Sequence, residues 1–161
     1  MLRLSKLTDY GIVAMTHVGG EPDRIHAAAE LAATIGVTVP TASKVLKILA
    51  GANLLRSVRG AKGGYMLSRP AEEISIAELI DALEGPIGLT ECSAIAGLCA
   101  LEGSCSIRTN WRRINRVIRD ALGQMTLADL AQPTFKPVVK PVRLEARRAP
   151  RLPTLSGRGP V

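Results

Sequence analysis

The sequence predicts a mainly α-helical protein, with a winged helix-turn-helix followed by a long C-terminal helix. Three observations lead to this fold class. Apolar residues make up 47% of the 161-residue chain but aromatic residues only 2%, which favours a core of packed aliphatic helices. Two short helical patterns are followed at once by a glycine-rich hairpin pattern. A separate amphipathic pattern occurs near the C-terminal end and predicts the long helix.

The first three helices follow from apolar residues spaced three and four positions apart. Leu7–His17 has this spacing, and Ala27–Ile35 is a short alanine-rich run. Gly36 suits the left-handed position that ends a helix. A third helix spans about Thr38–Ala52, with Thr38 as its N-cap and Pro40 in its first turn. Two helices joined by a short glycine-containing turn form a helix-turn-helix.

The segment "LLRSVRGAKGGYML" predicts the wing, because two apolar strands flank a cationic glycine-rich tip. Thr38–Arg69 contains six basic and no acidic residues, whereas much of the +7 net charge lies in residues 136–161, with seven basic and one acidic residue. The acid-free block indicates a basic face that binds double-stranded DNA. The candidate DNA contacts are Thr38, Thr41, Ser43, Lys44 and Lys47 on the third helix, and Arg59 and Lys62 on the wing.

The remaining chain divides by composition. Ser75 and Glu78 predict a capping box for a helix that ends near Leu83. Ile107, Trp111, Ile114, Ile118, Ala121 and Met125 form an apolar stripe on a helix over Arg108–Leu122, which we expect to mediate dimerisation rather than pack on its own domain. We therefore expect a winged helix-turn-helix DNA-binding domain (1–84), a cysteine loop that binds a cluster (85–106), a dimerisation helix with a terminal turn (107–132) and a basic, proline-rich disordered tail (133–161).

All three cysteines, Cys92, Cys99 and Cys105, lie within fourteen residues, in the spacing C-x6-C-x5-C. This spacing matches neither a zinc knuckle nor a thioredoxin-type C-x-x-C pair. Three soft thiolates on one loop suit an iron-sulfur cluster, which needs a fourth ligand. Because His17 and His26 are distant in sequence, the candidates for the fourth ligand are the carboxylates Glu91 and Glu102 or a group brought from elsewhere.

A family resemblance is carried by "LRLSKLTDYG", "VPTASKVLKIL", "SVRGAKGGYMLSRPAEEISIAELIDALEGPIGLTECS", the three cysteines and "NWRRIN". Over about residues 1–132 the chain resembles the Rrf2 family of winged-helix regulators, and within it the regulators of SUF-type iron-sulfur cluster assembly. The resemblance implies a homodimeric transcription factor that holds an iron-sulfur cluster, 2Fe-2S in preference to 4Fe-4S, on Cys92, Cys99 and Cys105. It also implies that the state of the cluster changes the affinity for promoter DNA.

Two departures from the family pattern concern the fourth ligand. Isc-type regulators place a histidine three residues after the last cysteine, where this chain has Arg108, which cannot ligate. Nitric-oxide-sensing members use an aspartate of the first helix that reaches across the dimer, and the matching "LTDYG" supplies Asp9. The resemblance therefore suggests Asp9 as fourth ligand, with the alternative that Asp9 only caps the first helix. The spacing from Cys92 to Cys99 is one residue longer than in many relatives, which leaves the cluster type open.

The expected function is a DNA-binding transcriptional regulator, a repressor of iron-sulfur cluster assembly genes. The alternatives are a thiol-redox, nitric-oxide or zinc-responsive regulator of the same family, and a cluster carrier with incidental DNA affinity. No serine-histidine-aspartate or paired-acid motif is present, so we do not expect an enzyme. Because no apolar run approaches the roughly 18 residues of a membrane helix and no signal-peptide pattern is present, we expect a soluble, cytoplasmic protein.

Overall fold

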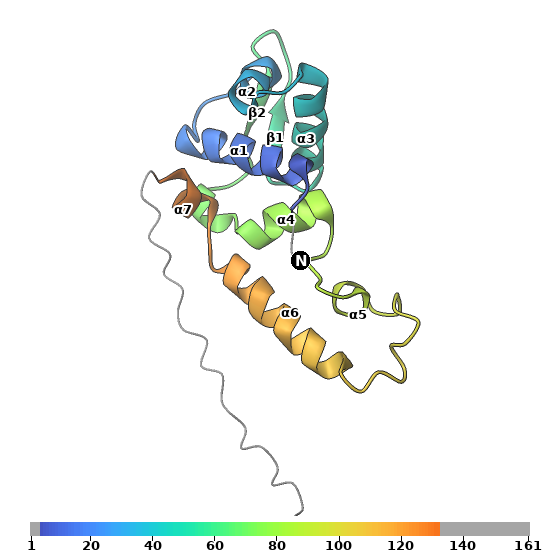
Figure 1. Ribbon diagram of the computed structural model, residues 1–161. Coiled ribbons are helices and arrows are strands. Elements are labelled where there is room, and N and C mark those ends of the chain that lie inside the picture. Colours follow the sequence, from blue (N-terminus) through green and yellow to red (C-terminus); the bar gives the residue numbers. More distant parts are fainter. Residues whose placement is uncertain (1–3, 133–161) are drawn as a thin grey trace, which may run out of the picture.

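A computed structural model describes residues 4–132 of the chain, and its helices and strands follow the predicted order (Figure 1). The predicted disordered tail at 133–161 lies outside the described residues. The elements are α1 (Lys6–Gly20), α2 (Ala28–Ile35), α3 (Val39–Gly51), β1 (Leu55–Val58), β2 (Gly64–Leu67), a 3-10 turn (Ala71–Glu73), α4 (Ile76–Glu84), α5 (Glu91–Ala94), α6 (Arg108–Gly123) and α7 (Leu127–Ala131).

The core lies between α1, α3 and α4 and is almost entirely aliphatic, as the low aromatic content predicts. The spacing of Ala42, Val45, Leu46 and Leu49 predicts a buried stripe on α3, and all four residues are fully buried. Met15 of α1 is also fully buried in this cluster. Each large aliphatic side chain contributes about 1.5–3 kcal/mol when it is fully buried, so this stripe fixes α3 against the rest of the head.

The start of α1 is held by Ser5 and Glu84. The Ser5 side chain accepts a hydrogen bond from the Thr8 N–H, so Ser5 is the N-cap and the alternative that Asp9 caps this helix is wrong. Glu84, the last residue of α4, accepts hydrogen bonds from the Thr8 hydroxyl and the Ser5 N–H, and these bonds lower the pKa of Glu84. The end of α4 is thereby joined to the beginning of α1.

The turn between α2 and α3 has the predicted glycine but a different cap. Gly36 adopts φ 76°, the left-handed conformation that an L side chain disfavours. Thr38 occupies the N-cap position of α3, yet its hydroxyl pairs with the Thr41 hydroxyl at 2.9 Å and makes no bond to the helix backbone. The expected Thr38 cap is therefore confirmed in position and corrected in its hydrogen bond.

The wing is a two-stranded antiparallel sheet that is connected to the segment before α2. Leu55 pairs with Leu67 and Val58 with Gly64. The backbones of His26 and Tyr65 exchange hydrogen bonds of 2.8 and 2.9 Å, which join β2 to the chain between α1 and α2. A Cβ atom on Gly64 would lie 2.3 Å from the His26 carbonyl oxygen, so this close approach requires glycine.

Capping boxes stand at the start of α4 and at the start of α7. Ser75 and Glu78 form the predicted box at the start of α4, and Thr126 and Asp129 form a second box at α7. Hydrogen bonding to Thr126 lowers the pKa of Asp129. Leu127 of α7 is fully buried and packs with the core, so the chain returns to the head after α6.

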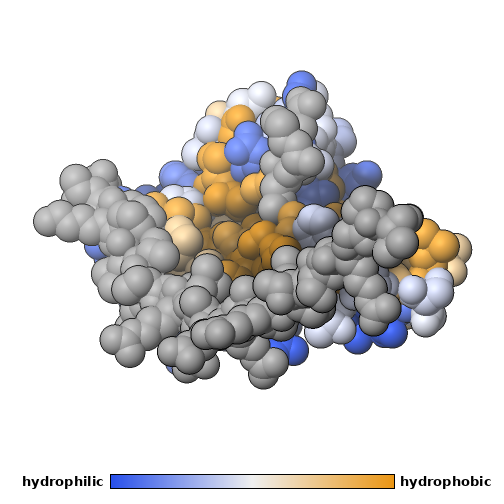
Figure 2. Space-filling model, turned by 60° about the horizontal axis from the view of Figure 1, so that its bottom comes forward, coloured by the Kyte–Doolittle hydropathy of each residue, from blue (hydrophilic) through white to orange (hydrophobic). Residues whose placement is uncertain are grey.

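The faces of α6 differ from the prediction of one uninterrupted stripe. The side turned toward its own chain is centred on Asn115, which is the buried residue of this helix. Trp111 and Ile118 are half-buried at the edge of that side, whereas Ile107 and Ile114 are 52% and 45% exposed. Figure 2 shows apolar surface gathered on the face of the molecule opposite the wing tip. The apolar stripe of α6 therefore lies beside the face that packs on the rest of the chain, and this packing covers only part of the stripe.

Within residues 4–132, no single helix has the length and hydropathy needed to cross a membrane. Only α2 and α3 taken together reach that length and composition, with a bend of 108° between them.

Candidate DNA interface and cysteine loop

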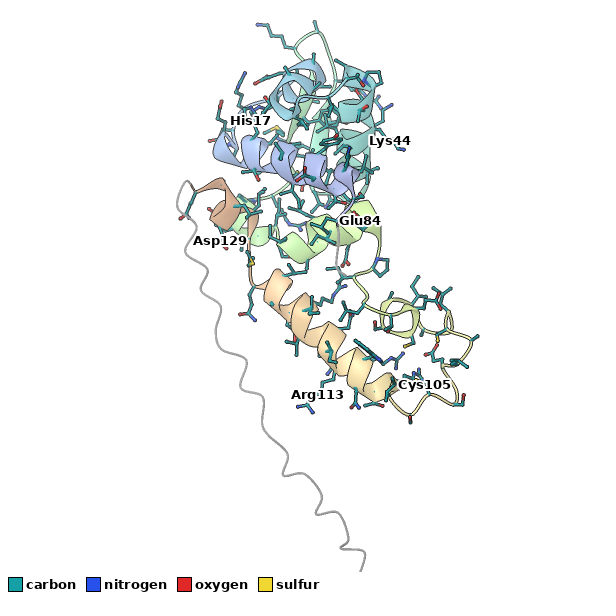
Figure 3. The ribbon with its side chains drawn as sticks, in the orientation of Figure 1. His17, Lys44, Glu84, Cys105, Arg113 and Asp129 are labelled. Carbon is teal, nitrogen blue, oxygen red and sulfur yellow. The ribbon has the colours of Figure 1, made fainter. Side chains whose placement is uncertain are left out.

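The predicted DNA-contacting residues of α3 are carried on its outer side. Lys44 and Lys47 are exposed, while Thr41 and Ser43 are half-buried, and Figure 3 shows Lys44 projecting away from α1. Neither lysine forms an ion pair with another described residue. Their ammonium groups are available for phosphate, the contact that dominates DNA affinity.

The wing tip places two cations on a narrow turn. Arg59 and Lys62 are both exposed. Between them Gly60 adopts φ 122°, and its carbonyl accepts a 2.9 Å hydrogen bond from the Gly63 N–H. A tight glycine-containing turn that carries an exposed arginine suits a minor groove, in which the negative potential attracts arginine.

Binding measurements will separate the roles of α3 and the wing. We expect Lys47→Ala to weaken binding to all DNA sequences alike and to reduce the salt dependence by about one charge, because it removes one phosphate contact. We expect Arg59→Ala also to reduce sequence discrimination, by about 1–3 kcal/mol. Titrations of specific and random DNA over a salt series test both, with Lys6→Ala as the control. Equal losses on both DNAs for Arg59→Ala would contradict a reading role for the wing.

The cysteine loop lies at the other end of the molecule from the wing, beside the beginning of α6. Cys92 is 6% exposed on α5, and its sulfur lies 3.3 Å from the Thr90 hydroxyl. Cys99 and Cys105 are half-buried in the turns that follow, and Figure 3 shows Cys105 next to the start of α6. All three cysteines are free thiols. The loop therefore contains a short helix that its turn-like composition did not predict.

The donor chemistry of the loop fits an iron-sulfur cluster, because such clusters take soft thiolate ligands. The same loop also carries exposed apolar side chains, with Ile95 at 50%, Leu98 at 58% and Leu101 at 68% exposure. In residues 4–132, however, the side-chain group whose ligand atoms converge within 4.8 Å contains no cysteine. Holding a cluster therefore requires the loop to bring the three sulfurs together.

Asn115 fastens the loop to α6. Its side-chain oxygen accepts from the Leu89 N–H at 3.1 Å, and its amide donates to the carbonyls of Ile87 at 3.0 Å and Ser93 at 3.4 Å. Arg112 of the same helix donates to the carbonyl of Cys92 at 3.4 Å. The backbone before, at and after Cys92 is thus hydrogen-bonded directly to side chains of α6.

Glu102 closes the far end of the loop. Its carboxylate accepts from the Gly97 N–H at 2.5 Å, pairs with Arg108, and lies 3.5 Å from the Arg112 guanidinium. Only 11% of the Glu102 side chain is exposed. Arg108, the residue that replaces a histidine of the isc-type pattern, is therefore committed to an ion pair.

The loop is connected to the DNA-binding head through α4. Asp81 of α4 forms a bidentate pair with Arg119 of α6, and it also accepts from the Ile87 N–H at 3.0 Å. α4 in turn contacts α1 and α3. α6 is thus connected through α4 to α3, the helix that carries the candidate DNA-contacting lysines.

The structure places Asp9 away from any convergent ligand group in the described part of the chain. Asp9 is exposed in the first turn of α1, one residue after Thr8. Because Thr8 is bonded to Glu84, Asp9 lies near the point at which the cysteine-bearing segment leaves α4. Asp9 therefore joins no ligand group within the described part of one chain. That Asp9 binds a cluster across a dimer stays a prediction.

Sequence reasoning named Glu102 only as a candidate fourth ligand. It did not find Asn115 or the Asp81–Arg119 pair, because ordinary polar residues on a helix or loop carry no local signal of their partners. It also treated His17 and His26 only as distant from the cysteines. A signal was present, since these are the chain's two histidines and Glu30 lies only four residues after His26.

The family model described as Rrf2, iron-dependent transcriptional regulator, matches residues 4–133. A protein called aau3 from Rhizobium meliloti is 28% identical over 132 residues, which cover 81% of this chain and 86% of that protein. The family match covers most of the chain and therefore indicates a transcriptional regulator.

Solved structures give the same result. The chain is similar to CymR of B. subtilis, described as the global cysteine regulator, with 28% identity, a TM-score of 0.66, and coverage of 83% of this chain and 99% of that one. CymR of Staphylococcus aureus is 30% identical with a TM-score of 0.62, and the match covers 82% of this chain and 100% of that one. IscR of T. potens is 26% identical with a TM-score of 0.59, and the match covers 80% of this chain and 85% of that one.

Proposed function

Since the chain belongs to the Rrf2 family of transcriptional regulators, and is thus a DNA-binding regulator rather than an enzyme, we propose that it senses an iron-sulfur cluster held by Cys92, Cys99 and Cys105. The proposal extends to a homodimeric repressor of iron-sulfur cluster assembly genes. Asp9 of the second subunit supplies the fourth ligand. When bound, the cluster supplies a redox-active and oxidant-labile centre.

The observation that carries the proposal is the direct bonding of the Cys92 backbone region to α6. Arg112 and Asn115 hold the carbonyls of Cys92 and Ser93. In this proposal, drawing the three sulfurs around one cluster would displace this segment, and α6 would then follow or these bonds would break. The spacing between the two α3 helices of a dimer must match roughly one turn of DNA, so a change at α6 changes operator affinity.

The region 85–106 thus acts as the sensor, 4–84 as the DNA-binding domain and 107–132 as the dimer contact. In this proposal a bound cluster would order the loop, whose apolar side chains Ile95, Leu98 and Leu101 are largely exposed. An ordered loop fixes α6, and a fixed α6 holds the two reading heads at one separation.

A second candidate is a thiol-redox regulator of the same architecture. It is favoured by the three free thiols, whose sulfurs do not converge, and by the similarity to CymR, described as a cysteine regulator. In that case oxidation of two cysteines, rather than a cluster, rearranges the loop.

Anaerobic reconstitution separates the two candidates. We expect the full-length chain to take up iron and sulfide in equal amounts with visible absorption, and Cys92→Ala to keep less than about a tenth of both. Ser106→Ala, an exposed hydroxyl of the same loop, is the matched control. Affinity for a DNA fragment selected from random sequence should differ at least about tenfold between cluster-loaded and cluster-free protein. Equal affinities for loaded, cluster-free and Cys92→Ala protein would remove the sensor role. Failure to take up iron, with affinity that follows thiol oxidation, would favour the second candidate.

A further inference from the structure

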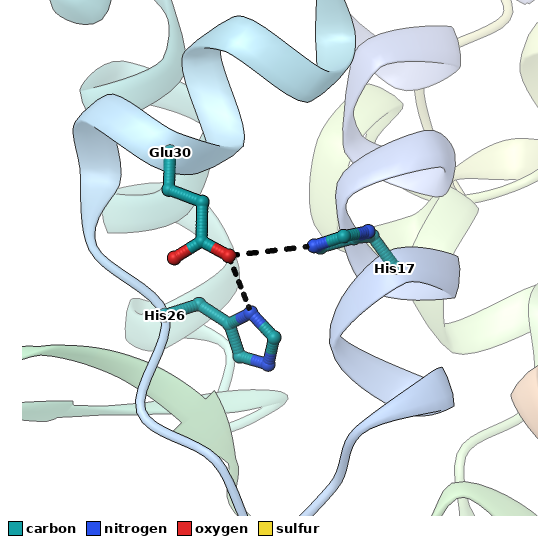
Figure 4. A group of neighbouring side chains, drawn as sticks. All are labelled: His17, His26 and Glu30. Atoms are coloured by element: carbon teal, nitrogen blue, oxygen red, sulfur yellow. Dashed lines mark ion pairs between the residues drawn. The ribbon is translucent and has the colours of Figure 1, made fainter.

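A second cluster of ligand-type side chains lies inside the DNA-binding head, far along the chain from the cysteines. His17 of α1, His26 before α2 and Glu30 of α2 point toward one another (Figure 4). One ligand atom from each lies within 4.8 Å of the others. The Glu30 Oε1 atom is 3.7 Å from His17 Nε2 and 3.7 Å from His26 Nδ1.

His26 is oriented as a metal ligand requires. Its side chain is fully buried, and its Nε2–H donates to the backbone carbonyl of Glu21 at 3.3 Å. This hydrogen bond leaves the lone pair of Nδ1 facing the Glu30 carboxylate. Metal-binding histidines usually donate their other ring N–H to a carbonyl or carboxylate, which sets the tautomer in this way.

Neither imidazole nitrogen that faces Glu30 is satisfied by a neighbour. His17 Nε2 and His26 Nδ1 are buried atoms with no hydrogen-bond partner among the described residues. The two rings lie edge to face with centroids 5.3 Å apart. A buried polar atom without a partner costs about 1–3 kcal/mol, so two of them beside one carboxylate need an explanation.

We propose that His17, His26 and Glu30 bind a divalent zinc ion, with water completing the coordination. Two imidazoles and a carboxylate are a common ligand set for Zn²⁺ with an open fourth position. Tetrahedral bonds of about 2.0–2.1 Å place ligand atoms roughly 3.3–3.5 Å apart. The observed separations are 3.7 Å from Oε1 to each nitrogen and no more than 4.8 Å between the two nitrogens, so binding requires the three side chains to move inward.

Arg24 competes for the same carboxylate. Its guanidinium lies 2.9 Å from Glu30 Oε1 and 3.1 Å from Glu21 Oε2. Because Arg24 is 49% exposed and keeps Glu21 as a partner, it is able to release Glu30 when the ion binds. The Glu30 side chain is itself 32% exposed, which gives a metal ion a path from solvent.

The position of the site gives the ion a structural role in DNA binding. Its three ligands connect α1, the segment before α2 and α2 itself, which packs on α3. The His26 backbone is also bonded to Tyr65 of the wing. One ion thus holds the helix-turn-helix and the wing in a fixed relation, independently of the cysteine loop.

Zinc titration of the full-length chain with all three cysteines replaced by serine tests the site without thiolate binding. We expect about one equivalent of Zn²⁺ to bind by calorimetry and to raise the melting temperature. Co²⁺ should give visible bands without the near-ultraviolet sulfur charge-transfer absorption. Glu30→Gln and His17→Gln should each weaken Zn²⁺ binding by more than about a hundredfold, since loss of an outer partner alone costs 10–100-fold.

Asp23→Asn is the matched control, because it changes a neighbouring exposed carboxylate that pairs with no described residue. We expect it to bind Zn²⁺ like the parent. The same Asp23→Asn and Glu30→Gln pair in the chain with its cysteines intact should differ by one equivalent of zinc, which guards against a folding defect of the serine variant. Absence of zinc binding in both backgrounds, or equal binding by Glu30→Gln and Asp23→Asn, would overturn the proposal.

Discussion

Asn115→Ala protein will lose about 2–4 kcal/mol of unfolding free energy, and its DNA affinity will cease to depend on the state of the cysteines. The side chain makes three hydrogen bonds to the backbone of residues 87–93 from a buried position. Removing it leaves the Leu89 N–H and two carbonyls without this partner, and each such group costs about 1–3 kcal/mol where it stays buried. Denaturant unfolding gives the first quantity. The ratio of DNA affinities for cluster-loaded and cluster-free protein gives the second.

Asn110→Ala is the matched control, because it removes the same amide from an exposed position of α6. We expect its unfolding free energy to stay within about 0.5 kcal/mol of the parent. If Asn115→Ala keeps the full affinity ratio while it loses stability, then Asn115 only holds the loop in place. The signal would in that case pass through Glu102, whose ion pairs with Arg108 and Arg112 also connect the loop to α6.

The elements of this fold were predictable because their signals are local. The capping box of Ser75 and Glu78 and the left-handed Gly36 depend only on neighbours within one turn, so the sequence contains all the information required. The buried stripe of α3 follows from the helical period alone. The predicted hydrogen bond of the Thr38 cap was wrong for a reason that is also local. The Thr41 hydroxyl, one turn later, pairs with the Thr38 hydroxyl in place of the helix backbone.

The site was less predictable because its contacts join residues distant in sequence. Asp81 and Arg119 are 38 residues apart, and nothing in either segment indicates the other. The convergence of His17, His26 and Glu30 required the packing of α1 on α2, which a spacing pattern does not give. For α6, the period placed the apolar residues on one side, but the intramolecular contact is centred on Asn115 beside them.

Ile114→Glu protein will fall apart into monomers and lose specific DNA binding. Ile114 is 45% exposed and Ile107 52% exposed on the side of α6 that its own chain leaves open. In a dimer formed through this side, a carboxylate at 114 would be desolvated without a partner, which costs several kcal/mol. We expect the dimer dissociation constant to rise by a hundredfold or more, about 2.7 kcal/mol. Sedimentation across a concentration series measures this change.

Arg116→Glu places a carboxylate on the opposite side of the same helix, two residues and about 200° further round. We expect this control variant to remain dimeric, since Arg116 is exposed and pairs with no described acid. Loss of DNA affinity in Ile114→Glu should follow dimer dissociation, because each subunit then reads only one half-site. A monomeric Ile114→Glu that still binds its DNA with full affinity would mean that one head suffices. The coupling between the cysteine loop and operator spacing would then have no physical basis.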